Sequence, residues 1–225
     1  MPKSARVTSA SQEDYLKALY GLGAGADSVP TSAVAEELGV SPASVSEMLG
    51  KLAGRALVTH DHYRGTRLTN SGSEIAVEIV RHHRLLETYL VRALGYSWDE
   101  VHQEADRLEH AISETLEERM WEALGRPAFD PHGHPIPAPD GTMTDCPVRP
   151  LHLVAEGCAF RVSRISDRDP EKLRAIERLG VLPGTRATVA EASRWEAPIK
   201  LELPVGGLMV PLGLARAIFV EELLG

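Results

Sequence analysis

The apolar positions of this 225-residue chain recur at helical spacing in its first half and at strand spacing in its last third. The first helical pattern covers residues 12–20 and predicts an amphipathic helix that begins near Ser11. Its apolar side consists of Tyr15, Leu16, Leu19 and Tyr20. The same helix carries Asp14, and a loop rich in glycine and alanine follows it.

Residues 30–58 contain two short helical patterns joined by a tight turn. Thr31 or Ser32 is expected to cap the first helix, and Gly39 is expected to make the turn. Ser41 followed by Pro42 is a typical start for the second helix, because serine caps free N–H groups and proline fits the first helical position. The residues expected to face inward are Val34, Ala35 and Leu38 on the first helix and Val45, Met48, Leu49 and Leu52 on the second. This spacing predicts a helix-turn-helix.

Two short alternating runs on either side of Tyr63-Arg64-Gly65 predict a β-hairpin directly after the second helix. A hairpin in that position is the wing of a winged helix. A helix-turn-helix pattern alone is also compatible with an ordinary helical hairpin that has only a structural role. The added wing favours DNA binding.

The middle of the chain carries residue types that bind metal ions. In a helix over residues 101–110, His102, Asp106, Glu109 and His110 would share one stripe beside an apolar seam. A second helix over residues 78–90 places His83 and Glu87 one turn apart on its apolar side. Imidazole together with carboxylate suits divalent transition metals. Alone, the stripe could be a solvated charged face and His83 an ordinary core histidine; two such helices in succession, able to face each other across a turn at Gly95, favour a metal centre.

A shorter third helix is expected to end near Gly125, and a segment dense in proline and glycine follows it. Its His132 and His134 are interpreted from the residues alone as parts of a turn rather than as ligands. From about Pro150 onward, short apolar runs separated by turns such as LPGT and VGG predict a small β-barrel. Cys146 and Cys158 lie outside the metal-binding helices and are interpreted as incidental.

The net charge of −8 would ordinarily disfavour a nucleic-acid partner, but its distribution changes that conclusion. Residues 1–75 hold 7 Lys and Arg against 8 Asp and Glu, a net of −1, whereas residues 76–140 hold 6 against 13, a net of −7. Bound cations would offset the acidity of the middle segment. No signal peptide or membrane span is indicated, so we expect no membrane partner and a cytoplasmic location.

Together these observations predict a mainly α protein with a small β domain. The expected domains are a winged helix-turn-helix DNA-binding domain over residues 1–75, a helical dimerisation and metal-binding domain over 76–140, and an SH3-like barrel over 150–225.

From residue 11 to about 140 the chain resembles the diphtheria toxin repressor family of metal-dependent transcriptional regulators. The resemblance is carried in order by EDYLKALY, SPASVSEML, HYRGTRLT, RHHRLLE, EVHQEADRLEH and DPHGHPIP. The last of these motifs gives His132 and His134 a place in the family pattern. Over the last part of the chain the resemblance is to the family's SH3-like domain and is weaker. It implies a homodimer that binds double-stranded operator DNA when loaded with metal and controls metal-homeostasis genes.

The resemblance also implies two metal sites per subunit. The family's primary site matches Asp14, Asp106, Glu109 and His110, and its ancillary site matches His83, Glu87 and His102. Asp169 or Glu171 lies about where a further ancillary ligand would come from. Iron-responsive members carry Met at position 14 and Cys at position 106; the carboxylates here favour Mn²⁺, with Fe²⁺ as the alternative. Lys17 stands where some manganese-responsive relatives have a second carboxylate.

The residues expected to contact DNA lie at the start of the second helix and in the wing. They are Ser41, Pro42, Ala43, Ser44 and Ser46 for the major groove and Lys51, Arg64 and Arg67 for phosphates. Two other classes compete with this interpretation: a metal-dependent hydrolase, and a metal-storage or interaction protein that keeps an unused DNA-reading domain. No phosphate loop or nucleophile motif supports an enzyme.

Overall fold

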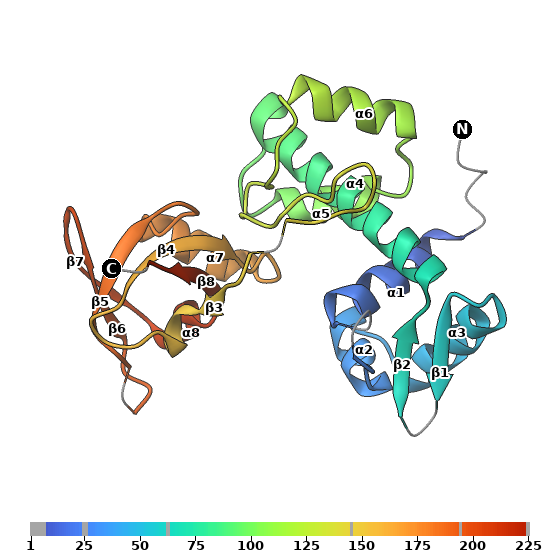
Figure 1. Cartoon of the computed structure of the whole chain (residues 1–225), viewed down its shortest axis with the longest axis horizontal. Helices are drawn as coiled ribbons and strands as arrows, with labels where there is room; N and C mark the ends of the chain where they lie inside the picture. The colour runs from blue at the N-terminus through green and yellow to red at the C-terminus, as the bar shows by residue number, and fades with distance from the viewer. Residues whose placement is uncertain (1–7, 24–26, 62–63, 145, 194, 224–225) are drawn as a thin grey trace. The chain divides into compact units, whose positions relative to one another are not determined.

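The structure is a computed structural model that describes residues 8–23, 27–61, 64–144, 146–193 and 195–223 (Figure 1). The chain forms two compact units. Unit 1 comprises Met1–His82 with two returning segments, Glu109–Ile112 and Pro137–Thr142. Unit 2 comprises His83–Leu108, Ser113–Ile136 and Met143–Gly225.

Unit 1 is built around the predicted helix-turn-helix. Helix α1 (Ala10–Gly21) begins one residue before Ser11, the expected start, because Ser9 and Gln12 cap it reciprocally. Helices α2 (Thr31–Leu38) and α3 (Pro42–Gly54) follow. The core of the unit is contributed by α1, α2, α3 and the wing: Tyr15, Leu16, Leu19, Val34, Val45, Leu49, Leu52 and Val58 are buried.

The two helix caps differ in how well they were predicted. The Ser41 side chain accepts a hydrogen bond from the Ser44 N–H at 3.1 Å, as expected for the start of α3. The expected cap of α2 by Thr31 or Ser32 is wrong, since Pro30 occupies that position without a side-chain cap and both hydroxyl residues lie inside the helix. Gly39 makes the turn with a φ of 64°, as expected.

The wing is an antiparallel hairpin of β1 (Val58–Asp61) and β2 (Gly65–Leu68), in which Val58 pairs with Leu68. Tyr63, expected in its turn, lies outside the described residues. Val29 bridges to Thr66, with N···O distances of 2.8 and 2.9 Å, so the wing is fixed to the segment before α2. Gly65 has a φ of 88°, and a Cβ there would lie 2.6 Å from the Val29 carbonyl oxygen.

Helix α4 (Asn70–Leu94) is the long helix of the middle segment. Gly95 ends it with a φ of 72°, and the Tyr96 N–H returns to the Leu90 carbonyl at 3.1 Å. Helix α6 (Glu114–Ala123) ends close to Gly125, as expected. Within the described residues no helix is both long and apolar enough to span a bilayer.

The helix expected over residues 101–110 is shorter, and that prediction is corrected: α5 covers Val101–Leu108. Glu109 and His110 lie in the following turn. The Glu109 carbonyl accepts a hydrogen bond from Nδ1 of buried His82 at 3.1 Å. The four stripe residues therefore do not share one helix face.

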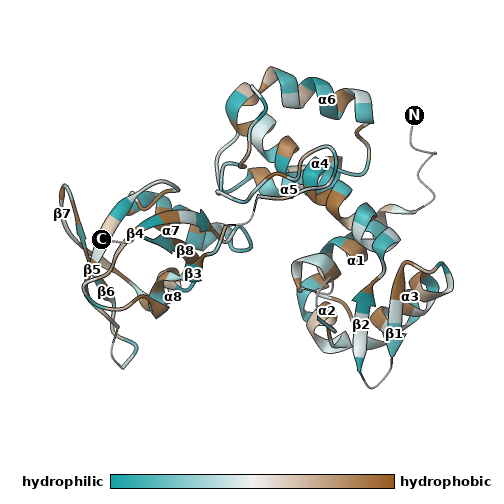
Figure 2. Ribbon diagram, in the orientation of Figure 1, coloured by the Kyte–Doolittle hydropathy of each residue, from teal (hydrophilic) through white to brown (hydrophobic). Residues whose placement is uncertain are grey.

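The last part of the chain is a six-stranded antiparallel sheet of order β3-β8-β4-β5-β6-β7 that encloses its own core. The strands are β3 (Arg149–Pro150), β4 (Ala159–Ile165), β5 (Arg186–Glu191), β6 (Ile199–Leu203), β7 (Gly206–Val210) and β8 (Ile218–Glu222). Figure 2 shows both hydrophobic and hydrophilic residues in this sheet, and buried positions alternate with less buried ones along β5, β6 and β8. The mainly α fold with an SH3-like β domain is confirmed. Helix α7 (Pro170–Arg178), which was not predicted, interrupts the strand series.

Candidate metal centres and DNA-reading surface

Three of the four residues expected in the primary site come together in unit 1. Asp14 lies on α1, and Glu109 and His110 lie in the turn after α5. His110 Nε2 is 2.9 Å from Asp14 Oδ1 and 3.6 Å from Glu109 Oε1. Together these residues offer three donor atoms within 4.8 Å of one another. Two ligands about 2.1 Å from an ion lie about 3.0 Å apart in octahedral and about 3.4 Å apart in tetrahedral geometry, so the spacing fits a divalent metal.

Glu13 orients the histidine of this site. Its buried carboxylate Oε2 lies 2.7 Å from His110 Nδ1. A carboxylate that accepts the Nδ1–H leaves Nε2 as the metal-binding nitrogen. The sequence analysis missed Glu13 because, at helical spacing, residues 13 and 14 point to different sides of α1. The turn that carries His110 places the imidazole so that Nδ1 lies beside Glu13 and Nε2 lies beside Asp14.

Lys17 neutralises the most buried carboxylate of the site. Its Nζ donates to both oxygens of Glu109, at 2.7 and 3.0 Å, and Glu109 is 1% exposed. Burial raises the pKa of Asp14 above its usual value, and Glu109 adds to the rise while His110 and Lys17 oppose it. The site therefore holds carboxylates for which a cation is favourable.

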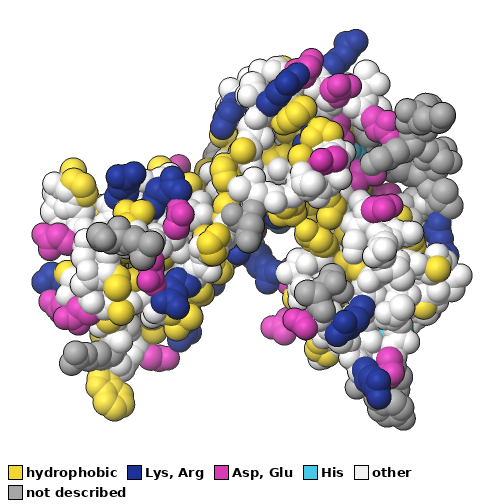
Figure 3. All heavy atoms as spheres, in the orientation of Figure 1, with side chains coloured by type: hydrophobic (Ala, Val, Ile, Leu, Met, Phe, Trp, Pro, Cys, Tyr) yellow, Lys and Arg dark blue, Asp and Glu magenta, His cyan; other side chains and the backbone are white. Residues whose placement is uncertain are grey.

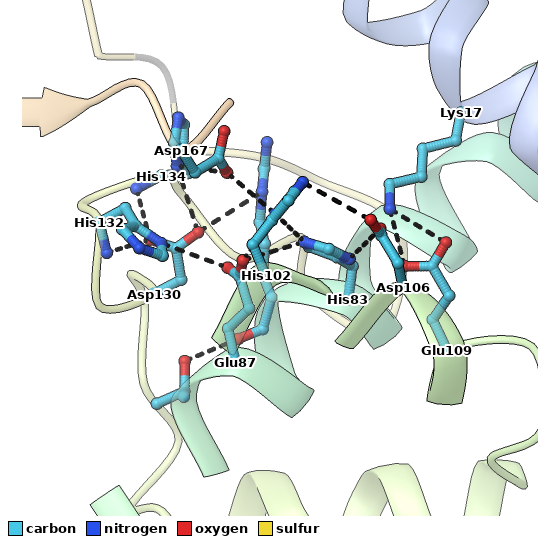
Figure 4. Close-up of polar contacts among 12 residues, drawn as sticks. Lys17, His83, Glu87, His102, Asp106, Glu109, Asp130, His132, His134 and Asp167 are labelled. Carbon is cyan, nitrogen blue, oxygen red and sulfur yellow. Dashed lines mark hydrogen bonds and ion pairs between the residues drawn. The ribbon is translucent and has the colours of Figure 1, made fainter. Parts of the chain in front are cut away.

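The three residues expected in the ancillary site meet in unit 2. His83 Nε2 lies 3.0 Å from Glu87 Oε1 and 2.9 Å from His102 Nδ1, and His102 Nδ1 is also 3.0 Å from Glu87 Oε1 (Figure 4). Glu87 is fully buried, yet the adjacent histidines hold its pKa well below the usual range against the opposing effect of burial. Donor atoms about 3 Å apart match neighbouring ligands of an octahedral ion.

Asp167, rather than Asp169 or Glu171, lies with the three expected ancillary residues. Asp167 follows β4 and places Oδ2 3.7 Å from His102 Nδ1, within the same donor group. Asp169 instead caps α7 by accepting the N–H groups of Glu171 and Lys172 at 3.0 and 3.2 Å. The structure therefore does not bring Asp169 or Glu171 into this donor group, since both belong to the start of α7, a helix that was not predicted.

Asp106 lies with the ancillary histidines. Its Oδ1 is 3.3 Å from His83 Nδ1, and its Oδ2 is 3.7 Å from His102 Nε2, one turn away on α5. The sequence groups Asp106 with Glu109 and His110 in two ways, through a helical stripe that runs to residue 110 and through the family pattern. α5 ends at Leu108, so the helix is shorter than that stripe requires, and the primary-site assignment of Asp106 stays a prediction.

The segment with His132 and His134 serves both as a turn and as part of a polar cluster. Asp130 Oδ1 accepts the N–H groups of His132 and His134 at 2.8 and 2.9 Å, and Gly133 has a φ of 89°. The turn interpretation is therefore correct. The imidazoles nevertheless point into the protein: His132 Nδ1 lies 3.6 Å from Glu87 Oε2, and His134 Nδ1 lies 3.3 Å from Asp130 Oδ2.

The residues expected to contact DNA lie on the surface of unit 1. All eight are exposed: Ser41, Pro42, Ala43, Ser44, Ser46, Lys51, Arg64 and Arg67. Lys51 forms an ion pair with Glu47 at 2.7 Å, and Arg64 is 3.9 Å from Asp61. On the face drawn in Figure 3, basic and acidic side chains are interspersed.

Comparison with known domains accounts for nearly the whole chain. Residues 7–66 match the domain described as "Iron dependent repressor, N-terminal DNA binding domain". Residues 69–138 match "Iron dependent repressor, metal binding and dimerisation domain", and residues 149–222 match the "FeoA domain". The iron-dependent repressor IdeR of Mycobacterium leprae is 32% identical over 222 residues, which cover 93% of this chain and 96% of the relative. The chain belongs to the diphtheria toxin repressor family.

Other members of the diphtheria toxin repressor family are similar in sequence or structure. The diphtheria toxin repressor of Corynebacterium glutamicum is 28% identical over 225 residues, covering 95% of this chain and 96% of the relative. A solved "Manganese-dependent transcriptional repressor complex with manganese" has a TM-score of 0.87 and 40% identity, and covers 94% of this chain and all of its own. The manganese regulator SloR has a TM-score of 0.77 and 31% identity, with 94% and 98% covered.

These relatives are transcriptional repressors, and the chain is accordingly a metal-dependent transcriptional repressor and not an enzyme. It carries the family's DNA-binding domain and the family's metal-binding and dimerisation domain.

Proposed function

We propose that this repressor binds operator DNA as a homodimer when it is loaded with Mn²⁺, and so controls genes of metal homeostasis. The observation that carries the choice of metal is Asp14, whose carboxylate meets His110 Nε2 at 2.9 Å beside Glu109. A hard oxygen donor at this position suits Mn²⁺. A repressor acts where the chromosome lies, so the proposal places the protein in the cytoplasm.

The structural relatives support manganese, whereas the sequence relatives keep Fe²⁺ as the alternative. The structure with a TM-score of 0.87 is titled a manganese-dependent repressor, and the mycobacterial relatives at 32% identity are named iron-dependent. Affinity alone does not separate these two ions strongly, so ligand type and metal availability decide. Asp14 and Asp106 are the two positions at which the chain departs from the iron-responsive pattern.

The proposal assigns two ions to each subunit. Asp14, Glu109 and His110 would hold the primary ion, and His83, Glu87 and His102, with Asp167, would hold the ancillary ion. We retain Asp106 as a primary ligand on the family pattern; its side chain is 47% exposed, so rotation away from His83 would disturb little packing.

The primary ion is the proposed switch. It would tie α1 to a turn almost one hundred residues later in the chain, because Asp14 comes from the first and Glu109 and His110 from the second. Without the ion the carboxylates repel and α1 is freer, which makes the DNA-binding state a minority. The expected DNA contacts remain the start of α3 for bases and Lys51, Arg64 and Arg67 for phosphates.

The deciding experiment is a DNA-binding titration under anaerobic conditions with Mn²⁺, Fe²⁺, Co²⁺ and Zn²⁺. The DNA would first be selected from a random pool by the Mn²⁺-loaded protein. We expect Mn²⁺ to support specific binding at the concentrations that a cell maintains. The double variant Asp14→Met, Asp106→Cys should shift the preference toward Fe²⁺.

Two controls make the result interpretable. Arg67→Gln should weaken binding equally on all DNA sequences and reduce its salt dependence without altering metal uptake. The proposal is contradicted if specific DNA binding is as strong in the presence of a chelator as in the presence of Mn²⁺. The choice of Mn²⁺ over Fe²⁺ is contradicted if the wild type and the double variant respond equally to Fe²⁺.

A further inference from the structure

We propose that Asp130, His132 and His134, together with Asp167, form a third divalent-metal site next to the ancillary centre. All four residues belong to unit 2. The first three stand in the turn before the β domain, and Asp167 follows β4 (Figure 4). This site shares only Asp167 with the proposed ancillary site, has no residue of the proposed primary site, and does not depend on which ion the repressor senses.

Buried polar atoms without hydrogen bonds point into this cluster. Asp130 and His132 have side chains that are 0% exposed, yet Asp130 Oδ2 and His132 Nδ1 have no hydrogen-bond partner among the described residues. The same holds for His134 Nδ1. Buried polar atoms are almost always hydrogen-bonded, so three neighbouring exceptions are unusual for a purely structural turn.

The spacing of these atoms suits shared coordination. His134 Nδ1 lies 3.3 Å from Asp130 Oδ2 and 3.8 Å from Asp167 Oδ2. Asp130, His132 and His134 offer donor atoms that all lie within 4.8 Å of one another. Tetrahedral ligands about 2.1 Å from an ion lie about 3.4 Å apart, so small side-chain movements would complete the site.

The hydrogen bonds of His132 fix the role of its ring nitrogens. Nε2 lies 2.9 Å from the Trp98 carbonyl oxygen, which only accepts, so Nε2 carries a proton. In the neutral ring, Nδ1 then presents a lone pair toward Glu87 Oε2 at 3.6 Å. That contact needs a cation between or near the two atoms.

The local charge also favours a cation. Glu87, Asp130 and Asp167 bring three carboxylates into one region. The Arg84 guanidinium lies 3.9 Å from Asp130 Oδ2, while its NH1 donates to the Pro135 carbonyl. Arg84 thus offsets part of the negative charge without forming a hydrogen bond to the oxygen that faces the histidines.

The turn is held rigidly, as a preformed site requires. The Ile165 N–H donates to the His132 carbonyl at 2.9 Å, and a Cβ on Gly133 would lie 2.1 Å from the Ser163 carbonyl oxygen. The turn is hydrogen-bonded to β4, and Asp167 follows β4 by two residues. The same strand therefore positions all the donor residues. The carboxylate of Asp167 would serve the third site and the ancillary site together, since it reaches His102 as well as His134.

The test is the number of ions bound by the metal-stripped full-length protein after dialysis against Mn²⁺ and, separately, Zn²⁺. We expect three ions per chain for the wild type and two for Asp130→Asn. This variant keeps Oδ1, which accepts from the His132 and His134 N–H groups, and changes only the oxygen that faces the ion. His134→Asn should also bind two, and the exposed wing variant Thr59→Ser should bind three as the matched control.

Combination with an ancillary variant separates the two centres. His83→Ala should lose one ion, and His83→Ala with Asp130→Asn should lose two. A wild-type count of two, or an unchanged count in both Asp130→Asn and His134→Asn, would overturn the third site while leaving the manganese proposal intact. Far-UV circular dichroism confirms that each variant is folded.

Discussion

At the scale of single residues, His110 shows how one side chain is prepared for metal. Its two ring nitrogens lie 2.7 Å from Glu13 and 2.9 Å from Asp14. The first contact orients the ring and the second provides a partner ligand, so the two neighbouring acidic residues of α1 have different tasks. Of these two residues, only Asp14 was inferred to be a ligand from the EDYLKALY motif.

We predict that Glu13→Gln weakens Mn²⁺ binding at the primary site by about 10- to 100-fold, the usual effect of altering the partner of a metal-binding histidine. The amide keeps the size of the side chain but not its charge. Isothermal titration with Mn²⁺ measures the effect, and Glu36→Gln, an exposed change on α2, is the control. Equal affinities of Glu13→Gln and the control would refute the orienting role.

We predict that Lys17→Met tightens Mn²⁺ binding at the primary site by roughly tenfold, equivalent to about 1.4 kcal/mol. The Lys17 ammonium donates to both oxygens of Glu109 and therefore competes with an ion for that carboxylate. The variant should also lower the stability of the metal-free protein, because Glu109 loses its counterion. Weaker binding in this variant would show that Lys17 supports the site rather than competing for it.

At the scale of elements, the junction between the wing and α4 depends on Gly72. A Cβ at this position would lie 2.0 Å from the Leu57 carbonyl oxygen. The adjacent Thr69 hydroxyl caps the helix by accepting the Gly72 N–H at 3.1 Å. This close approach of helix and strand connects the DNA-reading domain to the long helix within unit 1.

Gly72→Ala should therefore destabilise the protein by about 1–3 kcal/mol, which lowers the Tm by several degrees. Gly50→Ala is the matched control, since Gly50 is an exposed residue of α3 and a Cβ there would have nothing within 4 Å. Alanine there should stabilise α3 by about 0.5–1 kcal/mol. Calorimetry compares the two, and similar effects of both changes would contradict the packing argument.

The end of α5 is the element that most changed the metal assignments. Helical periodicity continues through residue 110, so the sequence favoured one stripe from His102 to His110. The hydrogen bond from His82 to the Glu109 carbonyl is a tertiary contact between residues 27 positions apart. Local sequence carries no signal for a contact of this kind, and the early end of α5 was therefore not predicted.

At the scale of the whole molecule, metal binding should contribute directly to stability. An ion that binds only the folded chain stabilises it by about 2.7 kcal/mol at one hundred times its Kd. The wild type should accordingly have a higher Tm in Mn²⁺ than in chelator, whereas Asp14→Asn should lose much of this gain.

Without metal, the variant Asp14→Asn should raise the Tm rather than lower it. The pKa of Asp14 is raised in the fold, chiefly by burial, so the folded state favours the protonated carboxyl. The associated stability is present below the unfolded pKa of about 3.9 and is lost as the pH rises through the folded pKa. At pH 7 in chelator, Asp14→Asn should therefore raise the Tm slightly, the effect being small because the side chain is 47% exposed. A pH series of melting curves tests the sign; a lower Tm than wild type in chelator at pH 7 would contradict it.

The sequence by itself determined the class of the protein, its order of elements and most of its ligands. Capping residues, helical periodicity and turn glycines are local signals, which is why α3, the wing, Gly95 and the strands of the β domain were predicted. His83 and Glu87 were found for the same reason, as they lie one turn apart on a single helix.

Only the tertiary structure decided which further residues join the expected ligands and what surrounds them. Asp167, Glu13 and His132 reach their sites from other segments, and Asp106 meets His83 rather than standing in a row with His110. Such groupings depend on where helices end and on contacts between residues distant in the chain. Metal coordination is set by distances of a few ångströms in space, which periodicity along one helix does not fix.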